Sequence, residues 1–266
     1  KNKLPAMGAL QMPLVVVPDV LKAMEDLGRA ARARSRAKIV AVTGSAGKTT
    51  CKDTLRDVLG HFGQVHASPA SFNNHWGVPL TLARMPEDTQ FAVFEIGMNH
   101  PDEIRPLVKM VTPHVAVVTT IAAAHLGQFE SLDAIADAKG EIFEGLVAGG
   151  TGVINGDLDQ TKRLCDLATR AKAGSILTFG EGSHNHTKLT GHALSGNGSQ
   201  FSALISGGAV DVTLNLPGRH QIQNMLGVLT VCDLFGVDLH EAAKQISLIK
   251  AGKGRGENSK LRIGSG

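Results

Sequence analysis

The residues best suited to chemistry form one glycine-rich segment, TGSAGKTT at residues 43–50. Glycines let the backbone turn tightly and point its N–H groups at phosphate oxygens. Lys48 can reach the terminal phosphates of a nucleotide, and the hydroxyl of Thr49 can bind Mg²⁺. We therefore predict a phosphate-binding loop made by these residues: Gly44, Ser45, Ala46, Gly47, Lys48, Thr49 and Thr50.

The surroundings of this segment support the prediction. A strand-like run at 39–42 precedes it, and the helical pattern that follows would add a positive N-terminal end. The general form of the loop has a further glycine where this chain has Val42, so the segment is a shorter variant. The alternative, a chance glycine-rich turn, does not explain why strand, glycines, lysine, threonine and helix occur together.

Two further side chains are candidates for a metal site. Glu95 ends the apolar run 91–94, which puts a carboxylate, a ligand suited to Mg²⁺, at the carboxyl end of a strand. His125 follows the strand-like run 115–119 and would lie at the same edge of a sheet. Each also has a structural interpretation, as an ordinary strand-end glutamate and as a structural or exposed loop histidine.

Lys139 lies in an apolar helical stripe with Leu132, Ile135, Ile142 and Leu146. Burial of an ammonium group is costly and lowers its pKa. The neutral amine can take up CO₂ and become a carbamate, which is a carboxylate-like metal ligand. The alternative is a lysine that lies along the apolar surface and keeps its charged end in water.

Strand-like and helical patterns alternate through most of the chain. The apolar runs that predict strands are 39–42, 65–67, 91–96, 115–119, 152–155 and 175–179. The helical patterns between them are 48–62, 79–85, 101–110, 132–146 and 160–171. Strands that are apolar on both faces favour a mostly parallel sheet flanked by helices, with ligands at the carboxyl ends of its strands.

The pattern changes after residue 187. Three short alternating segments predict a small antiparallel meander attached to the parallel sheet: 188–194, 200–205 and 210–214. Helices are expected at 221–235 and 239–249. The expected fold class is therefore α/β, P-loop-containing, with a mostly parallel sheet flanked by helices and the meander attached.

Before the glycine-rich segment, we expect a short strand at 14–17 and a helix that Asp19 can cap. Four residues fall on one apolar face of this helix: Val20, Met24, Leu27 and Ala31. Its end is basic, with Arg29, Arg32, Arg34, Arg36 and Lys38. We interpret these residues as a solvated helix face, with contact to an acidic ligand as the alternative.

Composition argues against several classes of function. A net charge of +3, one Trp and no Tyr do not favour a nucleic-acid binder. Three scattered cysteines form no C-x-x-C pair, which fits a reducing cytosol. No apolar run approaches the roughly 20 residues of a membrane span, so membrane insertion is not expected.

Several segments resemble the Mur ligases of bacterial cell-wall synthesis. They are TGSAGKTT at 43–50, FNNHWGVPLTL at 72–82, EIGMNHPDEI at 95–104, AAAHL at 122–126, AKGEIF at 138–143, LPGRHQIQN at 216–224 and Gly254-Arg255. The phosphate loop alone would not separate the Mur ligases from folylpolyglutamate synthetase. The second, third and fourth segments point to the branch of the family that adds D-alanyl-D-alanine (MurF type).

The resemblance implies three domains in a complete member. Residues 1–37 would be the end of the N-terminal domain, which holds the UDP end of the substrate, and its connector helix. Residues 38–250 would be the central ATP-binding domain. Residues 251–266 would be a hinge and the start of a C-terminal domain that helps bind the amine. We therefore expect this chain to be a fragment, inactive as a ligase on its own.

The resemblance also assigns roles to individual residues. Lys48 and the 44–49 backbone would bind the ATP phosphates, and Thr49 with Glu95 would hold one Mg²⁺. A second Mg²⁺ would be held by Glu95, His125 and a carbamylated Lys139. Four residues would line the substrate side: Asn73, Asn74, Asn99 and His100.

Three residues near the end of the chain would contact the nucleotide: His220 and Asn224 the adenosine, and Arg255 the phosphates. The family motif H-N-x-x-N is here HQIQN, so its first asparagine is replaced by Gln221. The outer histidine and asparagine of the motif are retained.

The implied activity is that of a bacterial, cytoplasmic, ATP-dependent ligase of peptidoglycan synthesis, a monomer that serves cell-wall biogenesis, cell shape and cell division. ATP would convert the carboxylate of UDP-N-acetylmuramoyl-tripeptide into an acyl phosphate, which the amine of D-alanyl-D-alanine attacks. Two metal ions and Lys48 would stabilise the phosphoryl charge. The alternatives are a nucleotide-binding module without ligase activity and a ligase like folylpolyglutamate synthetase.

Overall fold

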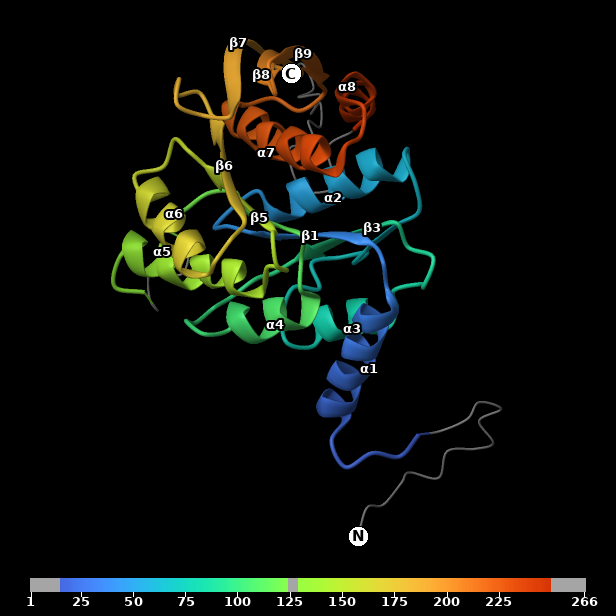
Figure 1. The fold of residues 1–266 in the computed structure, drawn as a ribbon. Coiled ribbons are helices and arrows are strands. Elements are labelled where there is room, and N and C mark those ends of the chain that lie inside the picture. Colours follow the sequence, from blue (N-terminus) through green and yellow to red (C-terminus); the bar gives the residue numbers. More distant parts are fainter. Residues whose placement is uncertain (1–14, 124–128, 250–266) are drawn as a thin grey trace, which may run out of the picture.

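The computed structural model describes residues 15–123 and 129–249, in which helices cover both faces of one long sheet (Figure 1). Within these residues the sheet has nine strands in the order β2-β3-β1-β4-β5-β6-β7-β8-β9. The strands are β1 (Lys38–Thr43), β2 (Val65–Ala67), β3 (Phe91–Glu95), β4 (Val115–Val118), β5 (Thr151–Asn155), β6 (Ser175–Gly180), β7 (Thr187–Ser195), β8 (Gly198–Ile205) and β9 (Gly208–Leu214). Neighbouring strands from β2 to β7 pair in parallel, and β7, β8 and β9 form an antiparallel meander. The expected fold class is confirmed.

Two hydrophobic layers cover the sheet, one on each face. The helices are α1 (Val20–Arg34), α2 (Lys48–Gly60), α3 (Gly77–Ala83), α4 (Ile104–Val111), α5 (Leu132–Gly140), the 3₁₀ helix η1 (Glu141–Gly145), α6 (Thr161–Arg170), α7 (Arg219–Phe235) and α8 (Leu239–Ser247). Val40 and Val42 of β1 pack in the layer that contains α2, α7 and α8. Ile39 and Ala41 pack in the layer that contains α3, α4, α5 and α6. Because both faces are buried, the strand is apolar at every one of these positions.

The order of the strands brings the predicted chemistry to one edge. β1 lies between β3 and β4, and its carboxyl end leads into the glycine-rich segment. In the parallel register, Val42 is the partner of Glu95 on β3, and Thr43 is the partner of Val118 on β4. The end of each neighbouring strand therefore lies beside the start of the phosphate loop, as a ligand site in an α/β sheet requires.

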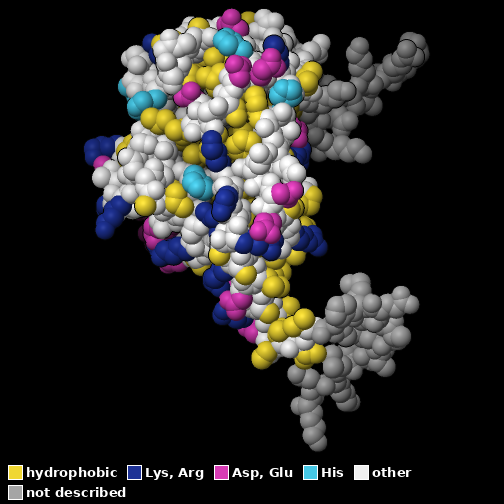
Figure 2. All heavy atoms as spheres, turned by 45° about the vertical axis from the view of Figure 1, so that its right-hand side comes forward, with side chains coloured by type: hydrophobic (Ala, Val, Ile, Leu, Met, Phe, Trp, Pro, Cys, Tyr) yellow, Lys and Arg dark blue, Asp and Glu magenta, His cyan; other side chains and the backbone are white. Residues whose placement is uncertain are grey.

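α1 forms as expected but buries a different face. The carboxylate of Asp19 accepts a hydrogen bond of 3.0 Å from the backbone N–H of Lys22, and so caps the helix. Of the predicted apolar face, Ala31 is buried whereas Val20 and Leu27 are 65% and 63% exposed. Figure 2 shows apolar side chains at the surface where α1 leaves the body of the molecule. The residues described at 15–17 form no strand.

Three of the five basic residues at and after the end of α1 donate hydrogen bonds to backbone carbonyls. The guanidinium of Arg32 donates to the carbonyls of Val111 and Thr112, both at 2.9 Å, where α4 ends. Arg34 donates to the carbonyl of Met85 at 2.8 Å, just after α3, and Lys38 donates to the carbonyl of Phe235 at 2.6 Å, the last residue of α7. These cations meet the helix ends that carry partial negative charge. Arg34 and Lys38 remain exposed, as the solvated interpretation expects, whereas Arg32 is partly buried.

The predicted helix at 132–146 is divided into α5 and η1. A Cβ added at Gly140 would lie 2.5 Å from a methyl carbon of Leu167, so α5 packs closely on α6 where it ends. Among the described residues, no helix is both long enough and apolar enough to cross a membrane.

Candidate functional site

The phosphate loop connects β1 to α2 at the carboxyl edge of the sheet. Gly47 caps α2, and the Lys48 ammonium folds back to donate 2.7 Å to the carbonyl of Gly44. Ser45 is fixed to the segment after β4, because its N–H donates to the carbonyl of Thr120 at 2.8 Å. The first turn of α2 therefore presents its positive end to this side of the loop, an arrangement suited to phosphate oxygens.

Two glycines of the loop are required, Gly44 because of a close contact and Gly47 because of its backbone conformation. A Cβ at Gly44 would lie 1.9 Å from the hydroxyl oxygen of Thr119, whose hydroxyl donates to the carbonyl of Ala46 at 2.6 Å. Gly47 has φ 83°, a backbone conformation that favours glycine. The loop thus has the shape and the backbone freedom predicted from its composition.

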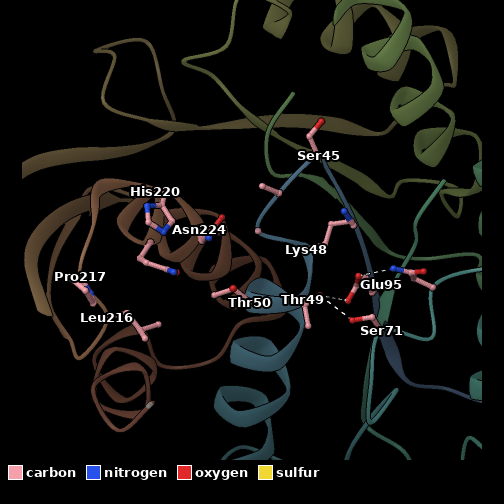
Figure 3. Close-up of a pocket in the computed structure, with 14 residues that line it drawn as sticks. Ser45, Lys48, Thr49, Thr50, Ser71, Glu95, Leu216, Pro217, His220 and Asn224 are labelled. Carbon is pink, nitrogen blue, oxygen red and sulfur yellow. Dashed lines mark hydrogen bonds between the residues drawn. The ribbon is translucent and has the colours of Figure 1, made fainter. Parts of the chain in front are cut away.

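Three oxygen-bearing side chains meet directly below the loop (Figure 3). The hydroxyl of Thr49 donates to Oε2 of Glu95 at 2.9 Å, and its oxygen lies 3.3 Å from the hydroxyl oxygen of Ser71. The amide of Asn73 donates to the other carboxylate oxygen of Glu95 at 2.8 Å. Glu95 is 2% exposed, so the carboxylate is held in a fixed position at the end of β3.

The chemistry of this cluster fits a magnesium ion. Mg²⁺ prefers oxygen ligands, and Thr49 and Ser71 supply hydroxyls and Glu95 a carboxylate, with Thr49 in contact with both of the others. No group of three or more His, Cys, Asp and Glu side chains in the described residues could hold a metal ion. A cation at this place would therefore use hydroxyls together with the carboxylate.

A cavity of about 640 Å³ extends from the phosphate loop to the start of α7, within the size range of ligand pockets. It is lined by Ser45, Ala46, Gly47, Lys48, Thr49, Thr50, Ser71, Asn73, Glu95, Leu216, Pro217, His220, Gln221 and Asn224. Figure 3 shows His220 and Asn224 on α7 at the end away from Glu95. The structure therefore places both predicted adenosine contacts beside the loop, with apolar Leu216 and Pro217 next to them.

A second cavity of about 680 Å³ lies on the other side of Lys48. It shares Ser45, Lys48 and Asn73 with the first cavity. Beyond the shared residues, its wall also contains the predicted residues Gly44, Asn74, Asn99 and Lys139. His100 is exposed and lines neither of these two cavities.

Asn74 has a structural contact in addition to its place in this wall. Its side-chain oxygen accepts hydrogen bonds from the N–H groups of Trp76 and Gly77, at 3.1 and 3.0 Å. These are the last residue before α3 and its first residue, so Asn74 caps the start of that helix.

Lys139 is buried at the second cavity, with 3% of its surface exposed. Burial, together with the charge of Lys48, lowers the pKa of the Lys139 ammonium to about 7. No hydrogen bond or ion pair joins it to another described residue. The burial expected from the apolar stripe is confirmed, and Lys139 lies in the wall of the second cavity.

Some residues were not found from the sequence, and some cannot be placed. Ser71 was missed because a serine in the loop between β2 and α3 carries no signal until it is seen beside Thr49. His125 and Arg255 lie outside the described residues. Glu95 lines the first cavity and Lys139 the second, and no hydrogen bond or ion pair joins these two described residues.

Residues 42–232 match the family described as Mur ligase middle domain. The UDP-N-acetylmuramoyl-tripeptide–D-alanyl-D-alanine ligase of Rickettsia prowazekii is 34% identical over 244 residues, covering 92% of this chain and 54% of that protein. A crystal structure of MurF from Acinetobacter baumannii superposes with a TM-score of 0.87 at 31% identity, over 94% of this chain and 54% of that one. MurF ligase from Thermotoga maritima, solved in complex with ADP, shares the fold with a TM-score of 0.79 at 24% identity, over 90% of this chain and 55% of that one. The chain spans about half the length of the curated relatives it matches.

Proposed function

The chain belongs to the Mur ligase family, and we propose that it carries the ATP-binding part of a ligase that joins D-alanyl-D-alanine to UDP-N-acetylmuramoyl-tripeptide. The observation that carries the proposal is the meeting of the phosphate loop with the Thr49–Glu95 pair at one end of a nucleotide-sized cavity. The name of the Rickettsia prowazekii relative favours this branch over a ligase like folylpolyglutamate synthetase. The ligase activity is proposed for the complete protein, with residues 38–250 as its central domain between the ends of two others.

ATP binds with its phosphates on the loop and its adenosine toward α7. The backbone N–H groups of 44–49 and the Lys48 ammonium hold the phosphates. His220 and Asn224 contact the adenosine, with Gln221 in the same wall. Arg255 approaches the phosphates in the complete protein.

A first Mg²⁺ is held by Thr49 and Glu95, and we add Ser71 to its ligands because its hydroxyl meets Thr49. A second is held by Glu95, His125 and Lys139 as its carbamate. Magnesium bound beside ATP neutralises part of the phosphate charge. The contribution of this chain is the fixed placement of the oxygen ligands, which Asn73 supports through its bond to Glu95.

The reaction needs no nucleophilic side chain from the protein. An oxygen of the tripeptide carboxylate attacks the terminal phosphorus of ATP, the bond to the bridging oxygen breaks, and ADP leaves. The amine of D-alanyl-D-alanine then attacks the carbonyl carbon of the acyl phosphate, phosphate leaves, and the nitrogen loses a proton. Lys48 and the loop N–H groups stabilise charge on the phosphoryl group, and the two cavities that meet at Lys48 orient the reactants.

The carboxylate substrate approaches from the second cavity. Asn73, Asn74 and Asn99 line it and supply amide groups suited to a peptide chain. His100, exposed on the adjoining turn, contacts the substrate in the complete protein. The enzyme acts as a cytoplasmic bacterial monomer on small-molecule substrates, without nucleic acid.

Calorimetry with ADP and Mg²⁺ tests the nucleotide site in this chain. Lys48→Ala should weaken binding about ten- to hundredfold, the loss expected for a hydrogen bond to a charged group. Lys162→Ala, which removes a lysine that is 88% exposed on α6, is the matched control and should bind like the wild type. Unchanged affinity in a folded Lys48→Ala variant would contradict the assignment.

A second candidate function, for residues 1–266 taken by themselves, is a nucleotide-binding module that does not ligate; these residues span about half the length of the curated relatives. Without the surfaces that hold the UDP end and the amine, the reactants are not kept in attack geometry. We expect no dipeptide-extended product from the isolated chain in a coupled assay. Product at the rate of the complete enzyme would refute this second candidate.

A further inference from the structure

The largest fully buried side chain in the described residues belongs to a lysine that the proposed chemistry does not use. Lys52 lies on α2, one turn after Lys48, and is 1% exposed. It does not line either of the two cavities. An ammonium group is costly to bury without partners, so its contacts indicate why it is there.

The Lys52 ammonium has three partners. It donates to the carbonyl of Ser68 at 3.0 Å and to the carbonyl of Ala70 at 3.3 Å. Its charge is balanced by the carboxylate of Asp53, at 2.9 Å. Both carbonyls belong to the segment between β2 and α3, whose residues 68–73 form neither helix nor strand.

This segment carries two of the side chains at the proposed magnesium position. Ser71 is the next residue after Ala70, and its hydroxyl oxygen lies 3.3 Å from that of Thr49. Asn73 follows two residues later and donates to Glu95 at 2.8 Å. The N–H of Gly97 donates to the carbonyl of Asn73 at 2.9 Å, which fixes the far side of the segment. The near side is fixed by Lys52.

We propose that Lys52 is a positioning residue for the bound cation: by holding the carbonyls of Ser68 and Ala70, it keeps Ser71 and Asn73 against Thr49 and Glu95. Lys48 and Lys52, one turn apart on α2, thus have different roles. Lys48 would contact the nucleotide phosphates, whereas Lys52 holds the segment that contributes Ser71 to the magnesium ligands. The inference rests on the proposed nucleotide site and adds a residue that determines how strongly Mg²⁺ strengthens nucleotide binding.

The test separates this role from a contribution to stability alone. ADP affinity of this chain is measured by calorimetry with Mg²⁺ and again with EDTA, and the ratio of the two affinities is the magnesium enhancement. In Lys52→Met, which keeps the apolar stem and removes the donors, the ratio should fall about ten- to hundredfold, as is usual when a group that orients a metal ligand is removed. Affinity in EDTA should stay that of the wild type, and Lys162→Met should keep the full ratio.

Two further measurements address the segment itself. Hydrogen exchange at the N–H of Gly97, which the segment protects, should accelerate in Lys52→Met while the N–H groups inside β1 exchange as before. Ser71→Ala should lower the same ratio, and the double variant should lose little more than either single one, because both act on one set of contacts. If Lys52→Met does not unfold cooperatively on heating, Lys52→Gln, whose amide NH₂ group retains uncharged N–H donors, takes its place and should lose part of the ratio.

The inference is overturned if the folded Lys52 variant keeps the wild-type magnesium enhancement, or if its loss adds fully to that of Ser71→Ala. A wild-type chain whose ADP affinity is the same in Mg²⁺ and EDTA would instead contradict the proposed cation site, and with it this role. The two failures are therefore distinguishable from the wild-type measurement alone.

Discussion

The side-chain oxygen of Asn224 lies 2.3 Å from the position that a Cβ on Gly47 would occupy. Gly47 is the cap of α2, and Asn224 lies on α7. The contact joins the phosphate end of the first cavity to its proposed adenosine end, and it exists only because residue 47 has no side chain. Gly47 is required both for its backbone conformation and for this approach.

Gly47→Ala should therefore lose nucleotide binding. The left-handed backbone at φ 83° would be strained by any Cβ, and the new methyl group would push α7 away from the loop. We expect ADP affinity, measured by calorimetry, to fall below detection, together with a loss of unfolding free energy in urea that exceeds the about 1–2 kcal/mol of backbone strain alone.

Gly207→Ala is the matched control for this change. Gly207 has nearly the same backbone, with φ 81°, but nothing lies within 4 Å of its Cβ position. It stands at the turn between β8 and β9, away from the site. Gly207→Ala should lower the free energy of unfolding only by the about 1–2 kcal/mol of backbone strain, and ADP affinity should stay that of the wild type. Equal effects of the two substitutions on binding would show that the Asn224 contact is unimportant.

The parallel sheet could be predicted because its central strands are largely apolar. Every residue of Phe91–Glu95 is buried, so the run is recognisable without knowing its neighbours. The buried face of α1 could not be predicted in the same way. α1 contacts α3 at Gly28, where a Cβ would lie 3.2 Å from the Cβ of Leu82. A glycine has no apolar side chain, so the hydrophobic pattern of the sequence does not reveal this contact.

Part of the candidate site could likewise be predicted from the sequence and part could not. The phosphate loop is contiguous in sequence, so its residue types and spacing are sufficient to predict it. Ser71 and Lys52 acquire their roles from residues far away in the chain, and neither a loop serine nor a helical lysine indicates such contacts from the sequence. Lys139 is intermediate, because its place in an apolar stripe predicted the burial that the structure confirms.

Arg32 should stabilise the fold more than its place in a basic helix end suggests. Its guanidinium donates to two carbonyls at the end of α4, and Arg32→Met would leave them without this partner. We expect a loss of about 1–3 kcal/mol in the free energy of unfolding, measured by urea denaturation. Arg29→Met on the same helix removes only exposed ion pairs and should change it by less than about 1 kcal/mol. Equal losses would contradict the capping role.

His114 should make stability depend on pH. Its Nδ1 accepts a hydrogen bond of 3.0 Å from the N–H of Ile39, which requires that nitrogen to be unprotonated. Burial, followed by the charges of Arg32 and Lys38, lowers the pKa of His114 below its ordinary value of 6.5. Between the lowered pKa and 6.5 the unfolded chain binds more protons than the folded one, so stability is full above 6.5 and falls as pH decreases through this window.

The measurement is the melting temperature of the wild type and of His114→Gln between about pH 8 and about pH 5. The wild type should lose more of its stability on acidification than the variant, whose residue 114 cannot take up a proton. His192→Gln, at an exposed position of β7, should follow the wild-type profile. If the melting temperatures of the wild type and of His114→Gln fall in parallel with pH, His114 is not the source of the pH dependence of stability.

Lys139 should carry a carbamate when CO₂ is present. Lys139 is 3% exposed, and its amine has no hydrogen-bond or ion-pair partner among the described residues and a pKa lowered to about 7, so a large share of it is neutral and able to attack CO₂ near neutral pH. The new C–N bond forms with loss of the amine proton and leaves a carboxylate-like group beside Lys48.

In ¹³C-labelled bicarbonate, the wild-type chain should show a protein-bound carbamate signal by NMR. Lys139→Met should lack this signal, and Lys162→Met should retain it. In the complete enzyme, Lys139→Ala should lower activity, and added short carboxylic acids should restore part of it. A signal that persists in Lys139→Met, or full activity of Lys139→Ala, would remove this residue from the proposed metal site.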